Sequence, residues 1–258
     1  MSIPTVYVFP IGHDDMSAAL AQYIASAQKA SIEHHGRFRI GISGGSLVEV
    51  VANGLLKNKD INFNVWDLFF VDERLVPLTD PESNYFQVKK YLLDRIPGDK
   101  TKMRVFHIDE SLLDDAQEVA DSYEKDLVKT FAAKDSVKHP QFDLLLLGCG
   151  PDGHTASLFP GHEALRESIA WVTPVEDSPK PPSRRITLTL PVLTHGTRIA
   201  FVATGSSKAD ILKSALEDSE STLPASLVTT GGGSKVSWFV DEAAVEGVSI
   251  QRKTWKSV

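Results

Sequence analysis

The sequence predicts an α/β protein built on a mostly parallel β-sheet. Short apolar runs alternate along the chain with longer segments of helical periodicity, which is the pattern of successive β-α-β units. The run 142–147 is nearly all aliphatic, as is typical of a central strand buried on both faces. A chain of 258 residues can form one large domain or two modest ones. We find no internal repeat and interpret the proline-rich stretch 179–182 as a loop inside the fold that borders an active site and not as a linker, so we expect a single domain, 1–258.

The first half of the chain supplies two β-α units. The apolar run 6–9 predicts a first strand, and the amphipathic segment 18–35 predicts a long helix after it. A second apolar run, 38–42, is followed by a helix over 46–57. Ser46, with Glu49 three residues later, has the spacing of a capping box and marks where that helix starts.

The remaining elements continue the alternation. A helix is expected at 112–133, because its apolar residues recur at close to helical spacing: Leu113, Ala116, Val119, Tyr123, Leu127 and Phe131. The other helices are expected at 83–93 and 207–217. Besides 142–147, the later apolar runs predict strands at 65–71, 186–190, 198–203 and 236–240, the last of which closes the sheet.

Composition and charge exclude several classes of protein. The contents of 42% hydrophobic and 24% charged residues are those of a globular protein with a core, and no apolar run is long enough to cross a bilayer. The segment 1–10 lacks the features of a signal peptide. The single cysteine, Cys149, excludes a disulfide framework, so we expect a cytoplasmic protein. A net charge of −7 without basic blocks makes nucleic acid an unexpected partner, and the even surface polarity favours a monomer or weak dimer.

Four polar clusters directly follow predicted strands. They lie at 43–46, 72–74, 148–154 and 205–208. In an open parallel sheet the carboxyl ends of the strands share one edge, and ligands bind there. Any one cluster is compatible with ordinary turn chemistry, but the four together predict a site.

The first cluster, Ser43, Gly44, Gly45 and Ser46, joins a strand to the start of a helix. Paired glycines let backbone N–H groups point outward and the helix N-terminus adds partial positive charge, which suits a phosphate. A plain tight turn with a helix cap accounts for this cluster equally well.

The segment 41–45 also spells G-x-S-x-G, the nucleophile-elbow pattern of α/β-hydrolases. The chain order permits Ser43, Asp72 and His154 as a catalytic triad. Against this hypothesis, Ser43 follows only the second strand, whereas the α/β-hydrolase fold places several strands before its nucleophile. His154 also comes with much of the sheet still to follow. We therefore do not favour the triad.

The segment 148–153 matches G-x-G-x-x-G after a good strand. A dinucleotide site needs a long helix to begin at that motif, and the sequence at 159–161, Phe-Pro-Gly, permits only a short one. We expect no nucleotide cofactor. A metal site is not expected either, because the remaining histidines lack ligand spacing.

His154 is the strongest candidate for a catalytic base. It follows the turn Pro-Asp-Gly at the carboxyl end of the most buried predicted strand, a position that favours a working histidine over a structural one. Asp152, two residues away, or Asp72 in the neighbouring loop would hold the imidazole in one tautomer. Backbone N–H groups of the turn 150–153 are expected to stabilise an oxyanion.

Cations are expected near the same edge. Arg185 opens a predicted strand, and Lys208 lies in the first turn of a helix, where its charge opposes the helix dipole and so indicates an anion. Arg74 and Arg184 are further candidates, although each alone is compatible with a surface charge.

With these residues identified, the sequence closely resembles the 6-phosphogluconolactonase family. The matching stretches span most of the chain in the order of the family: GISGGS (41–46), FFVDERLVPLTDPESNY (69–85), LLLLGCGPDGHTASLFPG (144–161), RRITLTLPVL (184–193) and TGSSKADIL (204–212). The resemblance implies a Rossmann-like, three-layer α/β/α fold related to glucosamine-6-phosphate deaminase and ribose-5-phosphate isomerase. It also implies metal-independent hydrolysis of 6-phospho-D-glucono-1,5-lactone, the second step of the oxidative pentose phosphate pathway.

The resemblance assigns roles to residues as well. It implies that His154 is the general base and that the other site residues bind the phosphate and hydroxyls of a sugar phosphate: Ser43, Gly44, Gly45, Ser46, Asp72, Arg74, Asp152, Gly153, Arg185 and Lys208. Related deaminases continue after the histidine into an Asn-Glu-Pro segment, whereas 157–160 here is Ser-Leu-Phe-Pro, without that carboxylate. A sugar-phosphate sensor without activity is the other alternative, and the presence of every motif residue argues against it.

Overall fold

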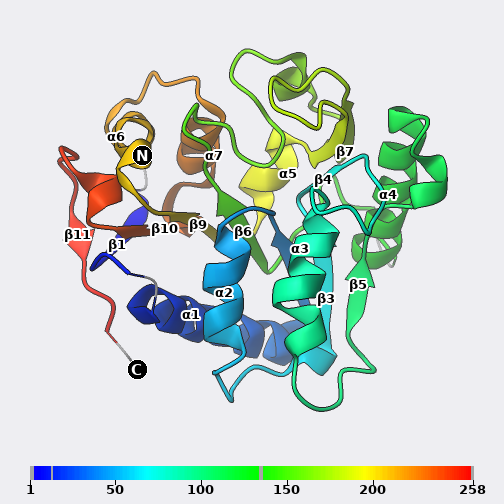
Figure 1. Cartoon of the computed structure of the whole chain (residues 1–258), viewed down its shortest axis with the longest axis horizontal. Coiled ribbons are helices and arrows are strands. Elements are labelled where there is room, and N and C mark those ends of the chain that lie inside the picture. The colour runs from blue at the N-terminus through cyan, green and yellow to red at the C-terminus, as the bar shows by residue number, and fades with distance from the viewer. Residues whose placement is uncertain (1–2, 13, 134–135, 257–258) are drawn as a thin grey trace.

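The computed structural model describes residues 3–12, 14–133 and 136–256. Its main sheet has eight strands among these residues, in the order β11-β1-β10-β9-β6-β2-β3-β5 (Figure 1). All of the pairings in this sheet are parallel. The strands are β1 (Thr5–Phe9), β2 (Phe38–Ile42), β3 (Trp66–Phe70), β5 (Arg104–Phe106), β6 (Leu144–Gly148), β9 (Ile199–Ala203), β10 (Val236–Asp241) and β11 (Arg252–Lys253). The prediction of a mostly parallel sheet is confirmed.

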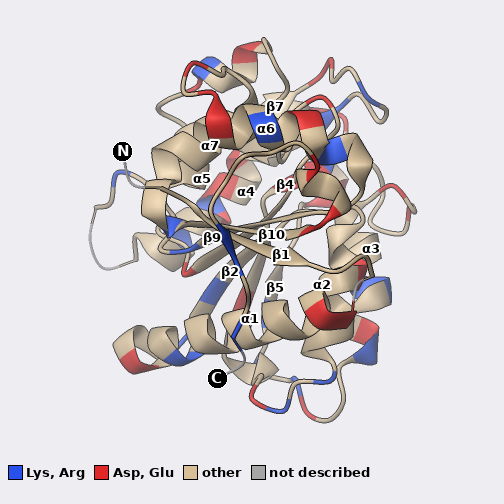
Figure 2. Cartoon of the chain, turned by 90° about the vertical axis from the view of Figure 1, so that its left-hand side faces the viewer, with Lys and Arg blue, Asp and Glu red and all other residues tan. Residues whose placement is uncertain are grey.

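Helices cover both faces of the sheet, which gives the three-layer α/β/α architecture (Figure 2). One core contains side chains of α1 (Asp14–His35), α2 (Leu47–Leu55) and α3 (Asn84–Tyr91). The other contains side chains of α4 (Ala116–Phe131), α5 (Leu190–His195), α6 (Ala209–Glu217) and α7 (Pro224–Gly232).

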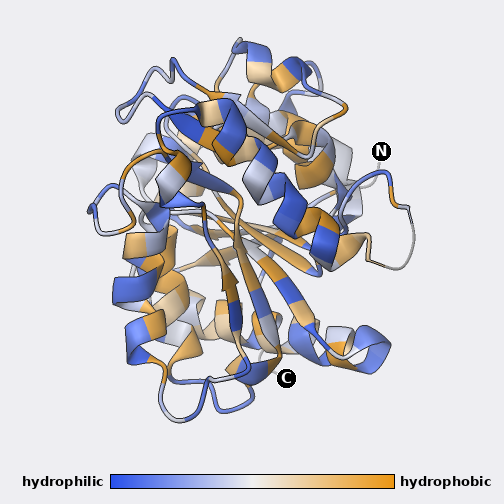
Figure 3. Cartoon of the chain, turned by 90° about the vertical axis from the view of Figure 1, so that its right-hand side faces the viewer, coloured by the Kyte–Doolittle hydropathy of each residue, from blue (hydrophilic) through white to orange (hydrophobic). Residues whose placement is uncertain are grey.

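Strand β6 shows how the two cores share the sheet. Leu144 and Leu146 belong to the core beneath α1 and α2, whereas Leu145 and Leu147 belong to the other, and all four are fully buried. Successive side chains of a strand point to opposite faces, so a strand covered on both faces must be apolar throughout. The apolar strands lie between the helix layers in Figure 3.

A second, antiparallel sheet is formed by segments that follow β3 in the sequence. It contains β4 (Asp72–Arg74), β8 (Arg185–Leu188) and β7 (Val172–Val175), with β8 in the middle. Its register places Arg74 opposite Arg185. The strand expected at 186–190 belongs to this sheet and ends at Leu188, because Thr189 is the N-cap of α5.

Two local predictions are wrong. Ser46 has helical backbone angles and makes no side-chain capping bond, so the expected capping box does not form. The turn is made one residue earlier by Gly45, with φ of +83°. The strand at 236–240 does not close the sheet, because β10 pairs with β1 on one side and β9 on the other. No helix in the described part of the chain is long and apolar enough to cross a membrane.

Candidate active site

The four predicted polar loops meet at the carboxyl edge of the main sheet and line one pocket. The predicted site residues that line it are Ser43, Gly44, Gly45, Ser46, Asp72, Arg74, His154, Arg185 and Lys208. The predicted site residues Asp152 and Gly153 do not line the pocket. Gly150 of the predicted cluster 148–154 also lines it, as do Asn84 and Thr204, which were not named as site residues from the sequence.

His154 is oriented by Asp152. Its Nδ1 lies 2.5 Å from Asp152 Oδ1, and its ring packs on Phe159 with the ring centroids 4.8 Å apart. Burial lowers the pKa of His154 below its ordinary value of 6.5, although the Asp152 carboxylate partly opposes this. The imidazole is therefore neutral at neutral pH. With Nδ1–H donating to Asp152, Nε2 is free to accept a proton.

The carboxylate of Asp152 remains ionised under these conditions. Partial burial opposes its ionisation, but hydrogen bonds from His154 and Lys180 outweigh burial and lower the pKa of Asp152 to about 2. Lys180 Nζ lies 3.0 Å from Asp152 Oδ1 and 3.2 Å from His154 Nδ1. Lys180 did not stand out in the sequence, because only folding brings the loop around 180 to the turn at 152.

Asp72 has other partners. Its Oδ2 accepts a hydrogen bond from Ser157 Oγ at 2.7 Å, and Asn84 Nδ2 donates to its carbonyl oxygen at 2.9 Å. Ser43 Oγ is buried and makes no hydrogen bond with any described residue. The contacts that would define a triad of Ser43, His154 and Asp72 are therefore not formed among the residues that the structure describes.

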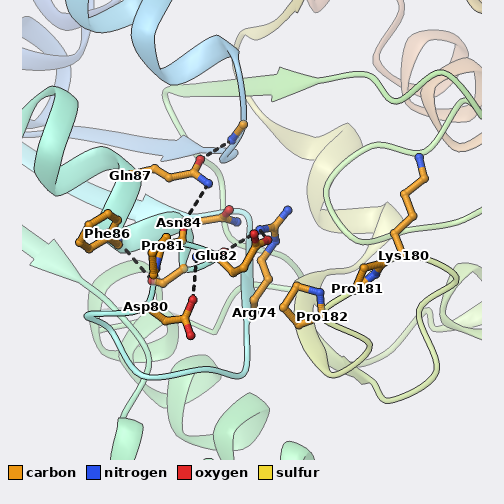
Figure 4. Close-up of polar contacts among 12 residues, drawn as sticks. Arg74, Asp80, Pro81, Glu82, Asn84, Phe86, Gln87, Lys180, Pro181 and Pro182 are labelled. Atoms are coloured by element: carbon orange, nitrogen blue, oxygen red, sulfur yellow. Dashed lines mark hydrogen bonds and ion pairs between the residues drawn. The ribbon is translucent and has the colours of Figure 1, made fainter.

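The glycine loop is closely packed against α3. A Cβ on Gly44 would lie 1.8 Å from Asn84 Oδ1, so any larger residue there would have to displace the Asn84 side chain. The N–H of Gly45 donates to Gln87 Oε1 at 2.8 Å (Figure 4). Gln87 thus occupies, in the free protein, a backbone donor of the kind that binds phosphate.

Glu73, the middle residue of the segment 72–74, anchors the start of α3. This side chain is 1% exposed and accepts hydrogen bonds from the backbone N–H groups of Asn84 and Tyr85 and from Ser83 Oγ. Burial raises the pKa of Glu73 to about 7, against the opposing effect of those backbone donors. The sequence shows an acid there but not that it holds α3 in place.

The cations differ in how much of their hydrogen-bonding capacity is used. Lys208 Nζ donates to the Cys149 carbonyl at 2.7 Å, and burial lowers the pKa of Lys208. Arg74 donates to the Glu82 carbonyl through one terminal nitrogen, while its buried Nε has no partner among the described residues. Arg184 lies elsewhere, with its guanidinium on the carbonyl oxygens of Leu113 and Asp114.

Arg185 is 2% exposed and supports a neighbouring loop. Its Nε donates to the Pro182 carbonyl, one terminal nitrogen donates to the carbonyls of Lys180 and Pro181, and the other donates to Ser157 Oγ. In Figure 4, Arg74 lies between the segment 80–87 and this loop. Burial, followed by the nearby charge of Arg74, lowers the pKa of Arg185.

The expected oxyanion donors in the turn are already used. The N–H of Gly150 donates to the His154 carbonyl, and the N–H of Gly153 donates to the Gly150 carbonyl. The prediction that these two groups are free to bind an oxyanion is therefore wrong, because they close the turn that holds His154. Burial raises the pKa of Cys149 to about 12, so this thiol is not a nucleophile at neutral pH.

Fold and pocket together define a class of protein. This is a Rossmann-like α/β protein with a ligand pocket at the carboxyl edge of its sheet, in which cations and a glycine loop face a neutral histidine.

Comparison with known proteins identifies the family. Residues 12–238 match the family described as "Glucosamine-6-phosphate isomerases/6-phosphogluconolactonase", and the chain belongs to this family. It is 50% identical over 245 residues to the probable 6-phosphogluconolactonase of Schizosaccharomyces pombe, covering 93% of this chain and 94% of the relative. It is 44% identical over 242 residues to the human 6-phosphogluconolactonase, and this match covers 92% of this chain and 91% of the human protein.

Solved structures agree with this family. The 6-phosphogluconolactonase from Leishmania guyanensis matches with a TM-score of 0.82 at 27% identity, covering 96% of this chain and 99% of that one. A monomeric glucosamine-6-phosphate deaminase, 19% identical over 94% of this chain and 99% of its own, matches with a TM-score of 0.74. The latter likeness confirms the expected relation to the deaminase fold.

Proposed function

We propose that this protein hydrolyses 6-phospho-D-glucono-1,5-lactone to 6-phospho-D-gluconate, in the oxidative pentose phosphate pathway, with His154 as general base. The curated relatives named above are a probable 6-phosphogluconolactonase and the human 6-phosphogluconolactonase. The observation that best supports the mechanism is the His154–Asp152 pair, because it leaves a neutral Nε2 in a pocket that also holds Lys208 and the glycine loop.

The reaction follows from this arrangement. His154 Nε2 removes a proton from a water molecule while the oxygen of that water attacks C1 of the lactone. Asp152 stabilises the imidazolium that forms. The C1–ring oxygen bond then breaks, and the imidazolium returns the proton to the leaving ring oxygen. The products are a free hydroxyl and a C1 carboxylic acid, which releases its proton to solvent to become the carboxylate. General-base catalysis of this kind contributes on the order of 10²- to 10⁴-fold, which suits an already activated ester.

The remaining residues bind and orient the substrate. We assign the phosphate to the loop 43–46 and Lys208, since backbone donors at a helix start and a half-buried ammonium group both favour an anion. Arg74, Arg185 and Asp72 form the facing wall and are assigned to the hydroxyl groups and ring. Asp152 and Gly153 act indirectly, through the turn that carries His154.

The test is hydrolysis of freshly generated lactone by wild type and by His154→Ala. Glucose-6-phosphate dehydrogenase generates the lactone, and 6-phosphogluconate dehydrogenase reports the product, against the spontaneous rate. His162→Ala is a matched control, since His162 Nε2 pairs with Asp177 at 2.8 Å outside the pocket. We expect turnover to be lost in His154→Ala alone, with binding of 6-phosphogluconate retained.

The other outcomes separate the alternatives. Wild-type turnover that survives in His154→Ala rejects the base assignment and leaves the reaction standing. A folded wild-type protein that binds 6-phosphogluconate without accelerating hydrolysis is a sugar-phosphate sensor. Ammonia released from glucosamine 6-phosphate would instead identify a deaminase.

A further inference from the structure

The loop 178–183 places Lys180 next to His154 and is held by hydrogen bonds from Arg185 and within the loop itself. Arg185 donates to the carbonyl oxygens of Lys180, Pro181 and Pro182, at 2.9, 3.2 and 2.8 Å. Ser178 Oγ donates to the Lys180 carbonyl and accepts from the Lys180 N–H. The backbone of Lys180 is therefore fixed at both of its polar groups, and its side chain extends from an anchored loop (Figure 4).

The ammonium group of Lys180 shares Asp152 with the imidazole. Lys180 Nζ and His154 Nδ1 lie 3.0 and 2.5 Å from the same oxygen, Asp152 Oδ1, and 3.2 Å from each other. An ammonium group is a donor only. When His154 Nδ1 is protonated, both nitrogens therefore donate to Asp152, and the carboxylate faces two donors instead of one.

Two consequences follow from this sharing. Lys180 holds the carboxylate from a second direction, which restricts the rotation that would otherwise release the imidazole. The ammonium charge also offsets part of the stabilisation that Asp152 gives to the imidazolium, because like charges so close together disfavour protonation of the ring. The side chain of Lys180 is 37% exposed, so solvent and salt screen part of this effect.

Building on the proposed lactonase reaction, we propose that Lys180 is a positioning residue for His154. It fixes Asp152 so that His154 Nε2 faces the substrate, and its charge keeps the imidazole neutral and favours return of the proton to the leaving oxygen. Lys180 touches neither the water nor the scissile bond in this role. Among the residues that the structure describes, the charged groups that act on His154 are Asp152, Lys180 and Asp72, of which Lys180 is the cation.

The test compares Lys180→Met with Lys180→Arg. Methionine removes the charge at similar length, and arginine keeps it. Lys129→Met is a matched control, since Lys129 forms an exposed ion pair with Asp126 at 2.8 Å. The readout is kcat/KM of the lactonase against pH, at low and high salt.

In Lys180→Met we expect the acid limb of the profile to move to higher pH, so that kcat/KM at the acidic end falls roughly three- to tenfold. The plateau at higher pH changes less, and the shift is smaller at high salt. Lys180→Arg and Lys129→Met should keep the wild-type limb. If the acid limb of Lys180→Met stays where it is in the wild type, the proposal is overturned. A uniform fall in kcat with an unmoved limb would indicate that Lys180 only supports the loop. A rise in KM alone with an unmoved limb would indicate that Lys180 contacts the substrate directly.

A second measurement separates this proposal from the lactonase assignment. The His154 ring can be titrated by NMR in the protein without ligand, with its signals identified by their loss in a His154→Gln spectrum. A midpoint that is higher in Lys180→Met than in wild type supports the positioning role even if the wild type has no lactonase activity. Equal midpoints overturn the positioning role even if the lactonase assay succeeds.

Discussion

Gly150→Ala tests the geometry of the proposed catalytic pair, His154 and Asp152, without changing either member. A Cβ on Gly150 would lie 2.1 Å from His154 Cε1 and Nδ1 and 2.5 Å from Asp152 Oδ1, whereas ordinary contact begins at 3.4 Å. The imidazole must therefore retreat by more than 1 Å. A misplacement of about 1 Å can lower a rate on the order of 10²-fold, or ~2.7 kcal/mol of transition-state stabilisation.

The assay is the coupled lactonase reaction, with binding of 6-phosphogluconate and the unfolding midpoint measured on the same samples. We expect kcat of Gly150→Ala to fall about 10²-fold with binding largely retained. Cys149→Ala is the control from the same loop, because it removes buried atoms and adds none near the imidazole. Near-wild-type kcat in a folded Gly150→Ala protein would refute the argument that the position of His154 limits the rate.

The pH profile of the wild type should have its acid limb below 6.5, because burial lowers the pKa of His154 and its neutral form persists as the pH falls; a limb above that value points to another base. Lys208→Met should raise the Kd for 6-phosphogluconate about ten- to a hundredfold by calorimetry, and an unchanged Kd would place the phosphate elsewhere. Gln87→Glu should weaken that binding further than Gln87→Ala, since it sets a carboxylate against the Gly45 N–H. Ser43→Ala should keep most of its activity and resist acylating reagents, whereas full inactivation would restore the triad hypothesis.

The main sheet was predictable because its signals are local. The run that forms β6 is apolar at every position, and such a strand has to be buried on both faces. The loops at 43–46 and 148–154 follow their strands directly, so a parallel sheet brings them together whatever its strand order. Strand order itself depends on contacts between distant segments, which explains why the interior position of β10 was missed.

Short elements were missed for a different reason. Helix α5 has six residues and a proline in its first turn, and α7 is rich in threonine and glycine at its end, so neither shows several turns of helical periodicity. Strand β5 has only three residues. Each of these elements is stabilised mainly by packing on the sheet, a contribution that local pattern does not report.

The candidate residues were found more readily than their roles. The motif containing Asp72 was identified, but Ser157, which donates to Asp72, lies 85 positions further along the chain. Arg185 was expected to bind substrate, and its guanidinium also holds the loop of Lys180. Much of the motif sequence therefore serves a buried hydrogen-bond network, and a residue's presence in a motif does not by itself indicate contact with a ligand.

The polar atoms that this network leaves unpaired are the better guide to the ligand. Ser43 Oγ, Arg74 Nε and Asn84 Oδ1 are buried atoms of residues that line the pocket, and they make no hydrogen bond with any residue that the structure describes. Each such group lowers stability by about 1–3 kcal/mol unless a partner arrives. Arg74 Nε can donate a hydrogen bond, Asn84 Oδ1 can accept one and Ser43 Oγ can do both. These capacities match hydroxyl groups beside a phosphate. A lactone without those hydroxyls would leave the three atoms unpaired in the complex, so we expect the pocket to discriminate against simple esters through its own unsatisfied groups.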